Sequence, residues 1–545
     1  MSEKNLLRMI AVSLLAYLPG LFVDVMDVDA AQYASISREM ADSGNFLEVM
    51  HRGENYLDKP PLLFWLSALM FNVFDPGNLV YKLPSFLVTL LGLYSLFRLT
   101  ERWYGRKTGL LAALMLSTSL AWYQFNNDVR TDTLLSGFVI FAVWQLDRFS
   151  QNNKPLNFIA GFTGIALAMM SKGPIGLIAP GMALGGHWLL RREWKQIFRP
   201  VWLLGLLLMG ILLLPMFIGL YRQYGWEGPY FFLWKQSFGR ITGENVWSND
   251  AGYFYFTHIF LWSFAPWSLT AVVALFLKLR RMIQARFSAV AAQEELISLC
   301  GWLLPFAALS LSQYKLPHYV FVCYPFTAMF LAGSLKPILE GNSKPERGLG
   351  LSFRLFPAVM LLLAIAIPVF IFPPQGWKTG VLILCTLLWI GGFLFLRKLK
   401  QQGMQQWIWM GAICAIALNF QMNSYFYPNL LRYEAPALAA RDIRELKIPI
   451  EQFRHAPQAC NIHAFEFYSE HINPYWHGND IRICKPYYSL CQGNTLDSLR
   501  ESGCSYTVYK TYADYRPTAL RLNFLNRATR AKAVDTLYLV RFGQP

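Results

Sequence analysis

The sequence predicts an α-helical polytopic membrane protein that crosses the bilayer about 13 times and ends in a small α/β domain. Of its 545 residues, 54% are hydrophobic and only 15% are charged, whereas a soluble domain usually has about 25% charged residues. Several apolar runs reach the roughly 18 residues that a bilayer crossing needs. The first run follows Lys4 and Arg8 but lacks a small-x-small cleavage site, which predicts an uncleaved first span.

Hydropathy divides residues 1–424 into spans and loops. The apolar stretch 60–74 has about 15 residues, which is short for a span. We therefore expect a helix that lies in the membrane interface there, with a further span as the alternative. The expected spans cover residues 6–23, 79–97, 108–125, 133–147, 156–171, 174–190, 201–220, 253–277, 295–311, 317–335, 352–372, 378–396 and 406–424.

Basic residues predict the orientation of these spans. Lys and Arg gather in loops that follow even-numbered spans, at residues 98–107, 191–199, 278–286 and 397–400. Because such charge marks the cytoplasmic side, these loops and the N-terminus are predicted to lie inside. The same explanation accounts for the net charge of +16, so the charge does not indicate nucleic-acid binding. The loops predicted to lie outside are 24–78, 126–132, 171–174, 221–252 and 312–319, together with the C-terminal tail.

The tail, residues 425–545, is predicted to form a second, external domain. It mixes helical patterns with short apolar runs such as YTVYK (506–510) and TLYLVRF (536–542), which indicate a small α/β fold. No Walker loop and no GxGxxG motif occurs in the sequence, so no nucleotide site is expected. An exported domain with four cysteines can hold two disulfides in one of three pairings, and the four here are Cys460, Cys484, Cys491 and Cys504.

The first external loop, residues 24–78, carries the strongest candidates for catalysis. Asp24, Asp27 and Asp29 open it, and YLDKPP (56–61) places Lys59 on a stiff proline-rich backbone. A carboxylate and a lysine that meet at a membrane face can take a proton from an acceptor or neutralise a phosphate leaving group. Considered singly, each of these residues is better explained as a solvated or helix-capping charge.

Further charged residues recur in the other external loops. Ionisable groups near the membrane plane are costly to desolvate and are candidates for function. Acids among several cations on one side indicate an active site for an anionic, lipid-linked ligand, with transport and lipid binding as alternatives. The residues are Asp128, Arg130 and Asp132 in NNDVRTD, Lys172 before Gly-Pro, Lys235 and Arg240 in WKQSFGR, and Lys315 and His318 in SQYKLPHY.

Two motifs resemble those of a known family. DVDAAQYASISREM (27–40) resembles the D-E-x-x-Y-A-x-x-x-R-E-M pattern of the superfamily C membrane glycosyltransferases, in the branch of the lipid A aminoarabinose transferase and the protein O-mannosyltransferase-like enzymes. YLDKPPLLFW (56–65) resembles that branch's Y-x-E-K-P-P segment, and RTDTLL, SKGP and YKLPHYVFVCYP follow in the family's order. The resemblance implies a helix bundle in the bacterial inner membrane under a soluble periplasmic domain.

The resemblance also implies roles for individual residues. The family's catalytic acid stands four residues before a tyrosine, which selects Asp29 and leaves Asp27 in reserve; a second external acid falls on Asp132. Ala30, Gln32 and Lys235 differ from the residues of the pattern at these positions, which leaves the sugar and the acceptor open. The residues that the resemblance implies to bind the substrate or the carrier phosphate are Lys59, Arg240, Tyr56, Asp58 and Tyr319. Tyr33 of the first motif and the loop residues Lys172, Lys315 and His318 are further candidates for binding.

We therefore expect a glycosyltransferase that moves a sugar, with inversion, from an undecaprenyl-phosphate-like donor to lipid A, lipopolysaccharide or another envelope acceptor. The alternatives are a protein O-glycosyltransferase of the same superfamily, a lipid-linked sugar transporter or flippase, and a non-catalytic scaffold. The expected partners are membrane lipid, the lipid-linked sugar and a glycolipid or protein acceptor, without nucleic acid. The sequence demands no cofactor. A divalent metal held by Asp29, Asp58 and Asp132 stays open, since no ligand spacing requires one.

Overall fold

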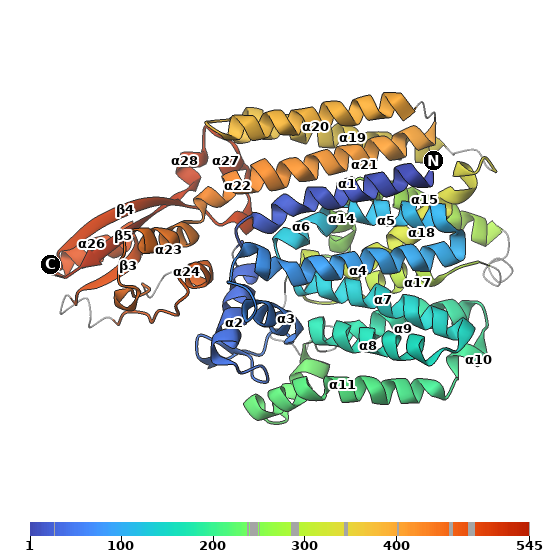
Figure 1. Ribbon diagram of the computed structural model, residues 1–545, viewed down its shortest axis with the longest axis horizontal. Helices are drawn as coiled ribbons and strands as arrows, with labels where there is room; N and C mark the ends of the chain where they lie inside the picture. Colours follow the sequence, from blue (N-terminus) through green and yellow to red (C-terminus); the bar gives the residue numbers. More distant parts are fainter. Residues whose placement is uncertain are drawn as a thin grey trace.

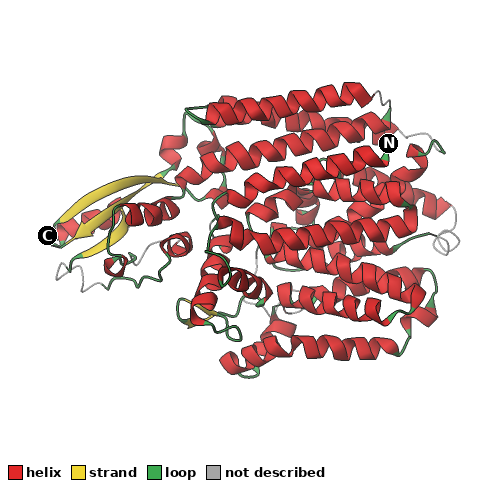
Figure 2. Cartoon of the chain, in the orientation of Figure 1, coloured by secondary structure: helices red, strands yellow, loops and turns green. Residues whose placement is uncertain are grey.

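The chain folds into a bundle of nearly parallel helices with a smaller domain at one end (Figure 1). Helices make up most of the chain, and strands occur in the small domain and in one short hairpin (Figure 2). The computed structural model describes residues 1–26, 28–236, 239, 249, 251–284, 294–342, 347–399, 403–456, 462–477 and 485–543.

The helices of the bundle fall where hydropathy predicts spans. Two expected spans are broken: residues 108–125 form α5 and α6, and residues 253–277 form α14 and α15, which meet at a bend of 119°. The bundle helices are α1 (Glu3–Phe22), α4 (Asn78–Tyr104), α5 (Arg106–Ser117), α6 (Leu120–Asn127), α7 (Thr131–Asn152), α8 (Pro155–Lys172), α9 (Ile175–Leu190), α11 (Val201–Tyr224), α14 (Tyr255–Ser263), α15 (Ser268–Gln284), α17 (Ile297–Ser310), α18 (Tyr324–Leu339), α19 (Arg347–Ala366), α20 (Lys378–Leu399) and α21 (Met404–Gln421).

Short helical segments connect or extend these helices. Tighter 3-10 turns and wider π turns form at several helix ends, where the regular hydrogen-bond ladder stops. The segments are α10 (Trp194–Ile197), α12 (Glu227–Tyr230), η1 (Phe231–Lys235), η2 (Pro317–Cys323), η3 (Ile367–Ile371), η4 (Met422–Phe426), α22 (Tyr427–Leu430) and η5 (Leu431–Tyr433).

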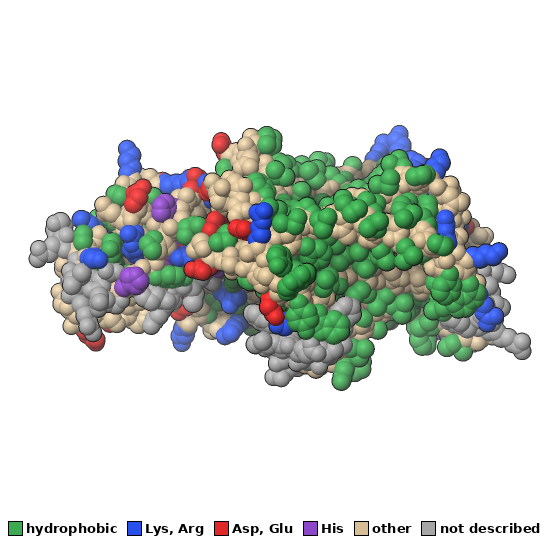
Figure 3. All heavy atoms as spheres, turned by 90° about the horizontal axis from the view of Figure 1, so that it is seen from below, with side chains coloured by type: hydrophobic (Ala, Val, Ile, Leu, Met, Phe, Trp, Pro, Cys, Tyr) green, Lys and Arg blue, Asp and Glu red, His purple; other side chains and the backbone are tan. Residues whose placement is uncertain are grey.

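The bundle has the surface of a multi-pass membrane protein. Within the described residues, six helical segments are long and apolar enough to cross a membrane, or seven if the bent pair α14–α15 counts as one. The other expected spans coincide with helices that are shorter or more polar, so the number of about 13 stays a prediction. Figure 3 shows hydrophobic side chains over the helical part, with Lys and Arg gathered at the end away from the small domain.

The first external loop folds against the end of the bundle next to the small domain (Figure 1). It contains α2 (Asp29–Ser43), a hairpin of β1 (Met50–His51) and β2 (Glu54–Asn55), and α3 (Leu62–Phe71). Arg52 and Gly53 both have positive φ, at 58° and 77°, as a tight two-residue hairpin turn requires. The ten residues of α3 extend about 15 Å, half of a bilayer's hydrocarbon core. This helix alone is too short to cross that core, and the interfacial position expected for residues 60–74 stays a prediction.

The small domain is an α/β unit, as its sequence pattern predicts. Its antiparallel sheet has the order β3-β5-β4, so the last strand of the chain lies in the middle. The strands are β3 (Tyr487–Gln492), β4 (Tyr506–Asp514) and β5 (Asp535–Phe542). Its helical segments are α23 (Ala435–Glu445), η6 (Ile450–Gln452), α24 (Ile462–Ser469), α26 (Gly493–Glu501), η7 (Pro517–Ala519), α27 (Leu522–Leu525) and α28 (Arg530–Ala533).

Two helices of this domain, α23 and α24, hold the start of the first loop. Arg441 of α23 pairs with Asp24 at 2.5 Å, so Asp24 joins the two parts of the chain instead of serving as a solvated or capping charge. From α24, the Tyr468 hydroxyl accepts a hydrogen bond from the backbone N–H of Val25 at 2.7 Å. Arg38 of α2 donates to the carbonyl of Phe467 at 3.2 Å. The domain thereby fixes both ends of the segment that carries Asp29.

The cysteines of the small domain do not form two disulfides. Cys504 is disulfide-bonded, whereas Cys491 is a free thiol buried in β3. Cys460 and Cys484 lie outside the described residues. The expectation of two bridges was therefore wrong, because Cys491 points into the apolar core of the sheet with Val540 and Phe542.

Candidate active site

Asp29 is the first residue of α2, and its carboxylate pairs with Arg130. Arg130 immediately precedes α7, and it also donates to Asp128 Oδ2 from Nε at 3.1 Å and from Nη2 at 2.9 Å. Burial lowers the pKa of Arg130 to about 10, so its guanidinium stays charged at neutral pH and stabilises Asp29 as a carboxylate. The Asp29 side chain remains 38% exposed and is accessible to a ligand.

Asp132 lies in the first turn of α7 and is only 2% exposed. It pairs with Lys172, the last residue of α8, and His318 Nε2 lies 3.9 Å from its other oxygen. The Lys172 ammonium also lies 4.5 Å from the centre of the Tyr319 ring. Asp132 is thus buried next to Lys172 and His318, and its role as a second catalytic acid stays a prediction.

Lys59 precedes the two prolines that lead into α3, and its ammonium pairs with the neighbouring Asp58. Gln236 donates to the backbone carbonyl of Asp58. The Lys59 side chain is 18% exposed. The amide of Gln236 therefore ties the Lys59 segment to the chain that follows η1 (Phe231–Lys235).

A cavity of about 210 Å³ brings these groups together. Asp29 comes from α2, Lys59 from the approach to α3, Lys172 from α8, and His318 and Tyr319 from η2. Much of the remaining wall is apolar and comes from α9 and α17, with Ile175, Ile178, Met182, Ala308 and Leu309. The cavity can therefore hold an anionic head group at its charged side and a hydrocarbon chain along its apolar side.

Several predicted residues lie elsewhere. Lys315 is 5% exposed and donates to the carbonyl of Ala251 at 2.8 Å, so it fastens a loop. Tyr33 and Tyr56 pack against Phe64, with ring centres 5.8 and 6.1 Å apart, and thereby hold α2 and the Lys59 segment to α3. None of these three is among the described residues that line the cavity. The predicted ligand roles of Arg240 and Asp27 fall outside the described residues.

Sequence reasoning missed three residues that shape the site. Arg130 was noted between two acids, but its pairing with Asp29 depends on the fold. Gln236 gives no sequence signal of its own. Lys82 is fully buried and donates to the carbonyls of Gly20 at 3.0 Å and Val23 at 2.6 Å at the C-terminal end of α1. A lysine inside an apolar span was a usable signal for a structural or functional role.

The three aspartates considered as metal ligands are engaged separately. Asp29 pairs with Arg130, Asp58 with Lys59, and Asp132 with Lys172. Side-chain cations thus neutralise each carboxylate in place, and the geometry gives no common centre for the three.

Fold and site together define a class of protein: a multi-pass membrane helix bundle with an acid and several cations in a half-apolar cavity beneath a small α/β domain. The family model described as dolichyl-phosphate-mannose-protein mannosyltransferase matches residues 58–218. An uncharacterized protein of Aquifex aeolicus (strain VF5) is 25% identical over 476 residues, which cover 87% of this chain and 88% of that protein.

Named relatives are bacterial arabinosyl transferases. The undecaprenyl phosphate-alpha-4-amino-4-deoxy-L-arabinose arabinosyl transferase of Edwardsiella ictaluri (strain 93-146) is 27% identical over 331 residues, or 59% of this chain and 58% of the relative. The enzyme of the same name from Pseudomonas aeruginosa (strain UCBPP-PA14) is 26% identical over 347 residues, or 62% and 60%. The chain thus spans about 60% of the length of these relatives.

A solved structure has the same fold. The crystal structure of ArnT from Cupriavidus metallidurans bound to undecaprenyl phosphate aligns with a TM-score of 0.73 at 19% identity, over 99% of this chain and 98% of that one. The family model over residues 58–218, the named relatives and this fold agree with the resemblance to the superfamily C membrane glycosyltransferases. The likeness of fold alone extends through the small C-terminal domain.

Proposed function

We propose that this protein is an inverting glycosyltransferase that moves a sugar from an undecaprenyl-phosphate-like donor to lipid A, lipopolysaccharide or another envelope glycan. The observation that carries the proposal is the single cavity that holds Asp29, Lys59 and Lys172 beside an apolar wall. The named relatives, which are arabinosyl transferases with an undecaprenyl phosphate substrate in their names, support the same donor class.

The charged side of the cavity would bind the donor phosphate. Lys59, Lys172 and His318 lie there, and the apolar side chains of α9 and α17 suit a polyisoprenyl chain. As the bond between the anomeric carbon and the phosphate oxygen breaks, negative charge grows on the phosphate, and fixed cations stabilise it. The loss of one such preorganised group typically costs about 10²–10³ in rate.

Asp29 would act on the acceptor. Its exposed carboxylate can accept the proton of an acceptor hydroxyl, or a hydrogen bond from it, while Arg130 keeps the carboxylate in place. The hydroxyl oxygen forms the new bond to the anomeric carbon from the side opposite the phosphate, and the polyisoprenyl phosphate leaves. One displacement inverts the anomeric carbon and needs only one base.

We further propose that residues 1–424 form the transferase domain and residues 425–545 a periplasmic domain, with the N-terminus in the cytoplasm. The N-terminus and the small domain lie at opposite ends of the bundle (Figure 1), and the basic loops lie with the N-terminus. This orientation places the cavity, which is next to the small domain, on the periplasmic side.

The test compares Asp29→Asn with Asp42→Asn, an exposed aspartate on the same helix. Mass spectrometry of lipid A and other envelope glycans, from cells with and without the gene, identifies the transferred sugar and its acceptor. Asp29→Asn should abolish this modification at normal protein levels, whereas Asp42→Asn should retain it. If cells with Asp29→Asn made the modified glycan at the wild-type level, Asp29 would have no role in the mechanism.

A second comparison concerns the donor. Lys59→Ala should raise the KM for the lipid-linked donor in purified protein, because Lys59 lines the cavity where the phosphate would lie. Unchanged kinetics would exclude Lys59 from the phosphate site. Protein that moves labelled lipid-linked sugar across vesicles without any transfer would instead support the transporter alternative.

A further inference from the structure

A second cluster of polar side chains lies outside the cavity, between the first external loop and the small domain. His51 belongs to strand β1 of the hairpin, and His463 and Glu466 lie one turn apart on α24. One ligand atom from each of the three lies within 4.8 Å of the other two. The rings of His51 and His463 have centres 4.9 Å apart.

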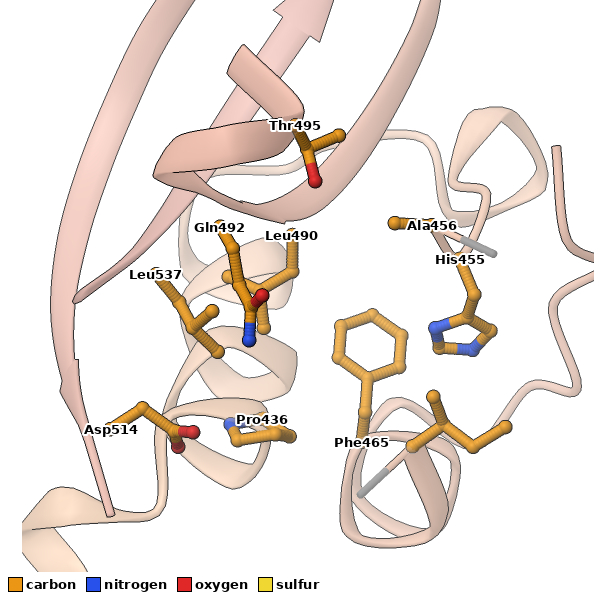
Figure 4. A pocket seen from close by; sticks show the side chains of 10 residues that line it. Pro436, His455, Ala456, Phe465, Leu490, Gln492, Thr495, Asp514 and Leu537 are labelled. Carbon is orange, nitrogen blue, oxygen red and sulfur yellow. The ribbon is translucent and has the colours of Figure 1, made fainter. Parts of the chain in front are cut away.

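Buried polar atoms in this cluster lack the hydrogen bonds that such atoms normally make. Within the described part of the chain, His51 Nε2, His463 Nδ1 and Glu466 Oε2 have no hydrogen-bond partner, and Glu466 Oε1 has ion-pair contacts instead of a hydrogen bond. Glu466 is 2% exposed and forms an ion pair with Arg52. His455 Nε2, also without a hydrogen-bond partner there, lies 3.5 Å from Glu466 Oε1. Figure 4 shows the His455 ring beside Phe465 at the wall of a small cavity.

We propose that His51, His463 and Glu466 bind a transition-metal dication of the zinc type, with His455 next to them as the fourth ligand. Two imidazole nitrogens and one carboxylate oxygen suit Zn²⁺, whereas Ca²⁺ and Mg²⁺ prefer oxygen ligands alone. A bound ion would satisfy the orphaned nitrogens and the Glu466 oxygens at once.

The ligand atoms of His51, His463 and Glu466 need only a small approach to close around an ion, and His455 Nε2 is placed beside them by its 3.5 Å distance to Glu466 Oε1. Tetrahedral zinc bonds of about 2.0–2.1 Å place ligand atoms roughly 3.4 Å apart, compared with separations of up to 4.8 Å here. Side-chain rotation covers this difference. If Glu466 binds the ion, Arg52 loses its ion pair with Glu466 but keeps two other contacts. It donates to the carbonyl of Asn473 at 2.8 Å and lies 4.8 Å above the Tyr475 ring.

The ion would fasten the small domain to the loop that delivers Lys59. The hairpin that holds His51 continues into Tyr56, whose N–H donates to the carbonyl of Val49 at 2.9 Å, and then into Lys59. Since the ligands come from segments more than 400 residues apart in the sequence, the binding energy would contribute directly to docking of the domain. The site is structural, and it does not depend on the proposed transferase activity.

The test uses full-length protein in detergent, purified without a histidine tag and treated with a chelator. Zn²⁺ titrated against a chromogenic competitor should give about one tight site per chain, Co²⁺ should give visible ligand-field absorption, and Zn²⁺ should raise the Tm. His51→Ala and the isosteric Glu466→Gln should each weaken Zn²⁺ binding at least tenfold. His258→Ala, a change in an exposed residue of α14, should bind Zn²⁺ as the wild type does.

The result on the wild type decides the proposal even if a variant folds poorly. The proposal would be overturned if wild-type protein did not take Zn²⁺ from the competitor and if Zn²⁺ did not raise its Tm. Equal Zn²⁺ affinity in the wild type and in folded Glu466→Gln would overturn it as well.

Discussion

The guanidinium of Arg130 pairs with the carboxylate of Asp29, although 101 residues separate them in the sequence. Arg130 also holds Asp128, so the turn between α6 and α7 fixes the position of Asp29. This pairing distinguishes Asp29 from Asp24, which is held by Arg441 of the small domain. Neighbouring acids of one loop thus have different partners and different roles.

Arg130→Gln should lower kcat for sugar transfer by about 10²-fold or more, with a smaller change in KM for the lipid donor. The reason is that Asp29 loses the group that orients it, while the cations beside the donor phosphate remain. Arg130→Lys should restore only part of the rate, because the single ammonium of lysine cannot hold Asp29 and Asp128 in the fixed geometry of the guanidinium. Steady-state kinetics on purified protein measures both values, and a wild-type kcat in Arg130→Gln would contradict the orienting role.

Variants of the Asp132–Lys172 pair should distinguish an effect on stability from an effect on catalysis. Lys172→Met leaves the buried Asp132 without its ion-pair partner, which typically costs about 3–5 kcal/mol, so the Tm should fall. The double variant Lys172→Met/Asp132→Asn should recover most of the Tm, because no charge is left buried. It should not recover the transfer rate, because the cation that faces the cavity is still missing. A double variant with wild-type activity would show that Lys172 serves folding alone.

Gly219 of α11 allows the first loop to pack closely on the bundle. A Cβ atom at Gly219 would lie 1.8 Å from the carbonyl oxygen of Leu47, whereas a Cβ at Gly210 of the same helix would meet nothing within 4 Å. Gly219→Ala should therefore displace the loop that leads to Lys59, at a cost of about 1–3 kcal/mol, and should lower both the Tm and the transfer rate. Gly210→Ala is the matched control and should behave as the wild type.

The small domain should be more stable in mild acid than at neutral pH because of Asp514. Burial, reinforced by the nearby Asp535, raises the pKa of Asp514 to about 6 from an ordinary 3.8. The folded protein therefore holds this proton more tightly than the unfolded chain. The resulting stabilisation is complete below about pH 4 and is lost as the pH rises through 6.

Asp514→Asn should remove this part of the pH dependence. A series of Tm measurements on both sides of pH 6 tests the effect in the full chain, with Asp497→Asn as the control because Asp497 is 70% exposed in the same domain. If the Tm of Asp514→Asn follows the wild-type pH curve, Asp514 does not cause the dependence.

Much of the fold could be predicted because membrane helices and external charges leave local signals. Each expected span coincides with a helix or a helix pair, and the short α3 lies where residues 60–74 were expected to stay in the interface. The breaks in the spans at α5–α6 and α14–α15 could not be predicted, because hydropathy averages over a window and does not register a bend.

The site could be predicted in part. Asp29, Lys59, Lys172, His318 and Tyr319 line one cavity, because each stands at or next to a helix end at the same end of the bundle. The buried position of Asp132, the anchoring role of Lys315 and the free thiol of Cys491 depend on packing between distant segments. A single sequence does not record such contacts, so the resemblance suggested a catalytic role for Asp132, and residue type suggested a ligand contact for Lys315 and left a disulfide open for Cys491.

The contacts of the small domain with the first loop impose an order on biosynthesis. Asp24 leaves the ribosome 417 residues before its partner Arg441, and Arg38 leaves it 429 residues before Phe467, whose carbonyl accepts its hydrogen bond. The loop that bears Asp29 is therefore synthesised early, and its contacts with the small domain form only when the last fifth of the chain arrives. The nascent protein matures late, so a chain truncated after α21 would keep the Arg130–Asp29 pair but leave Asp24 and Arg38 without their partners in the small domain.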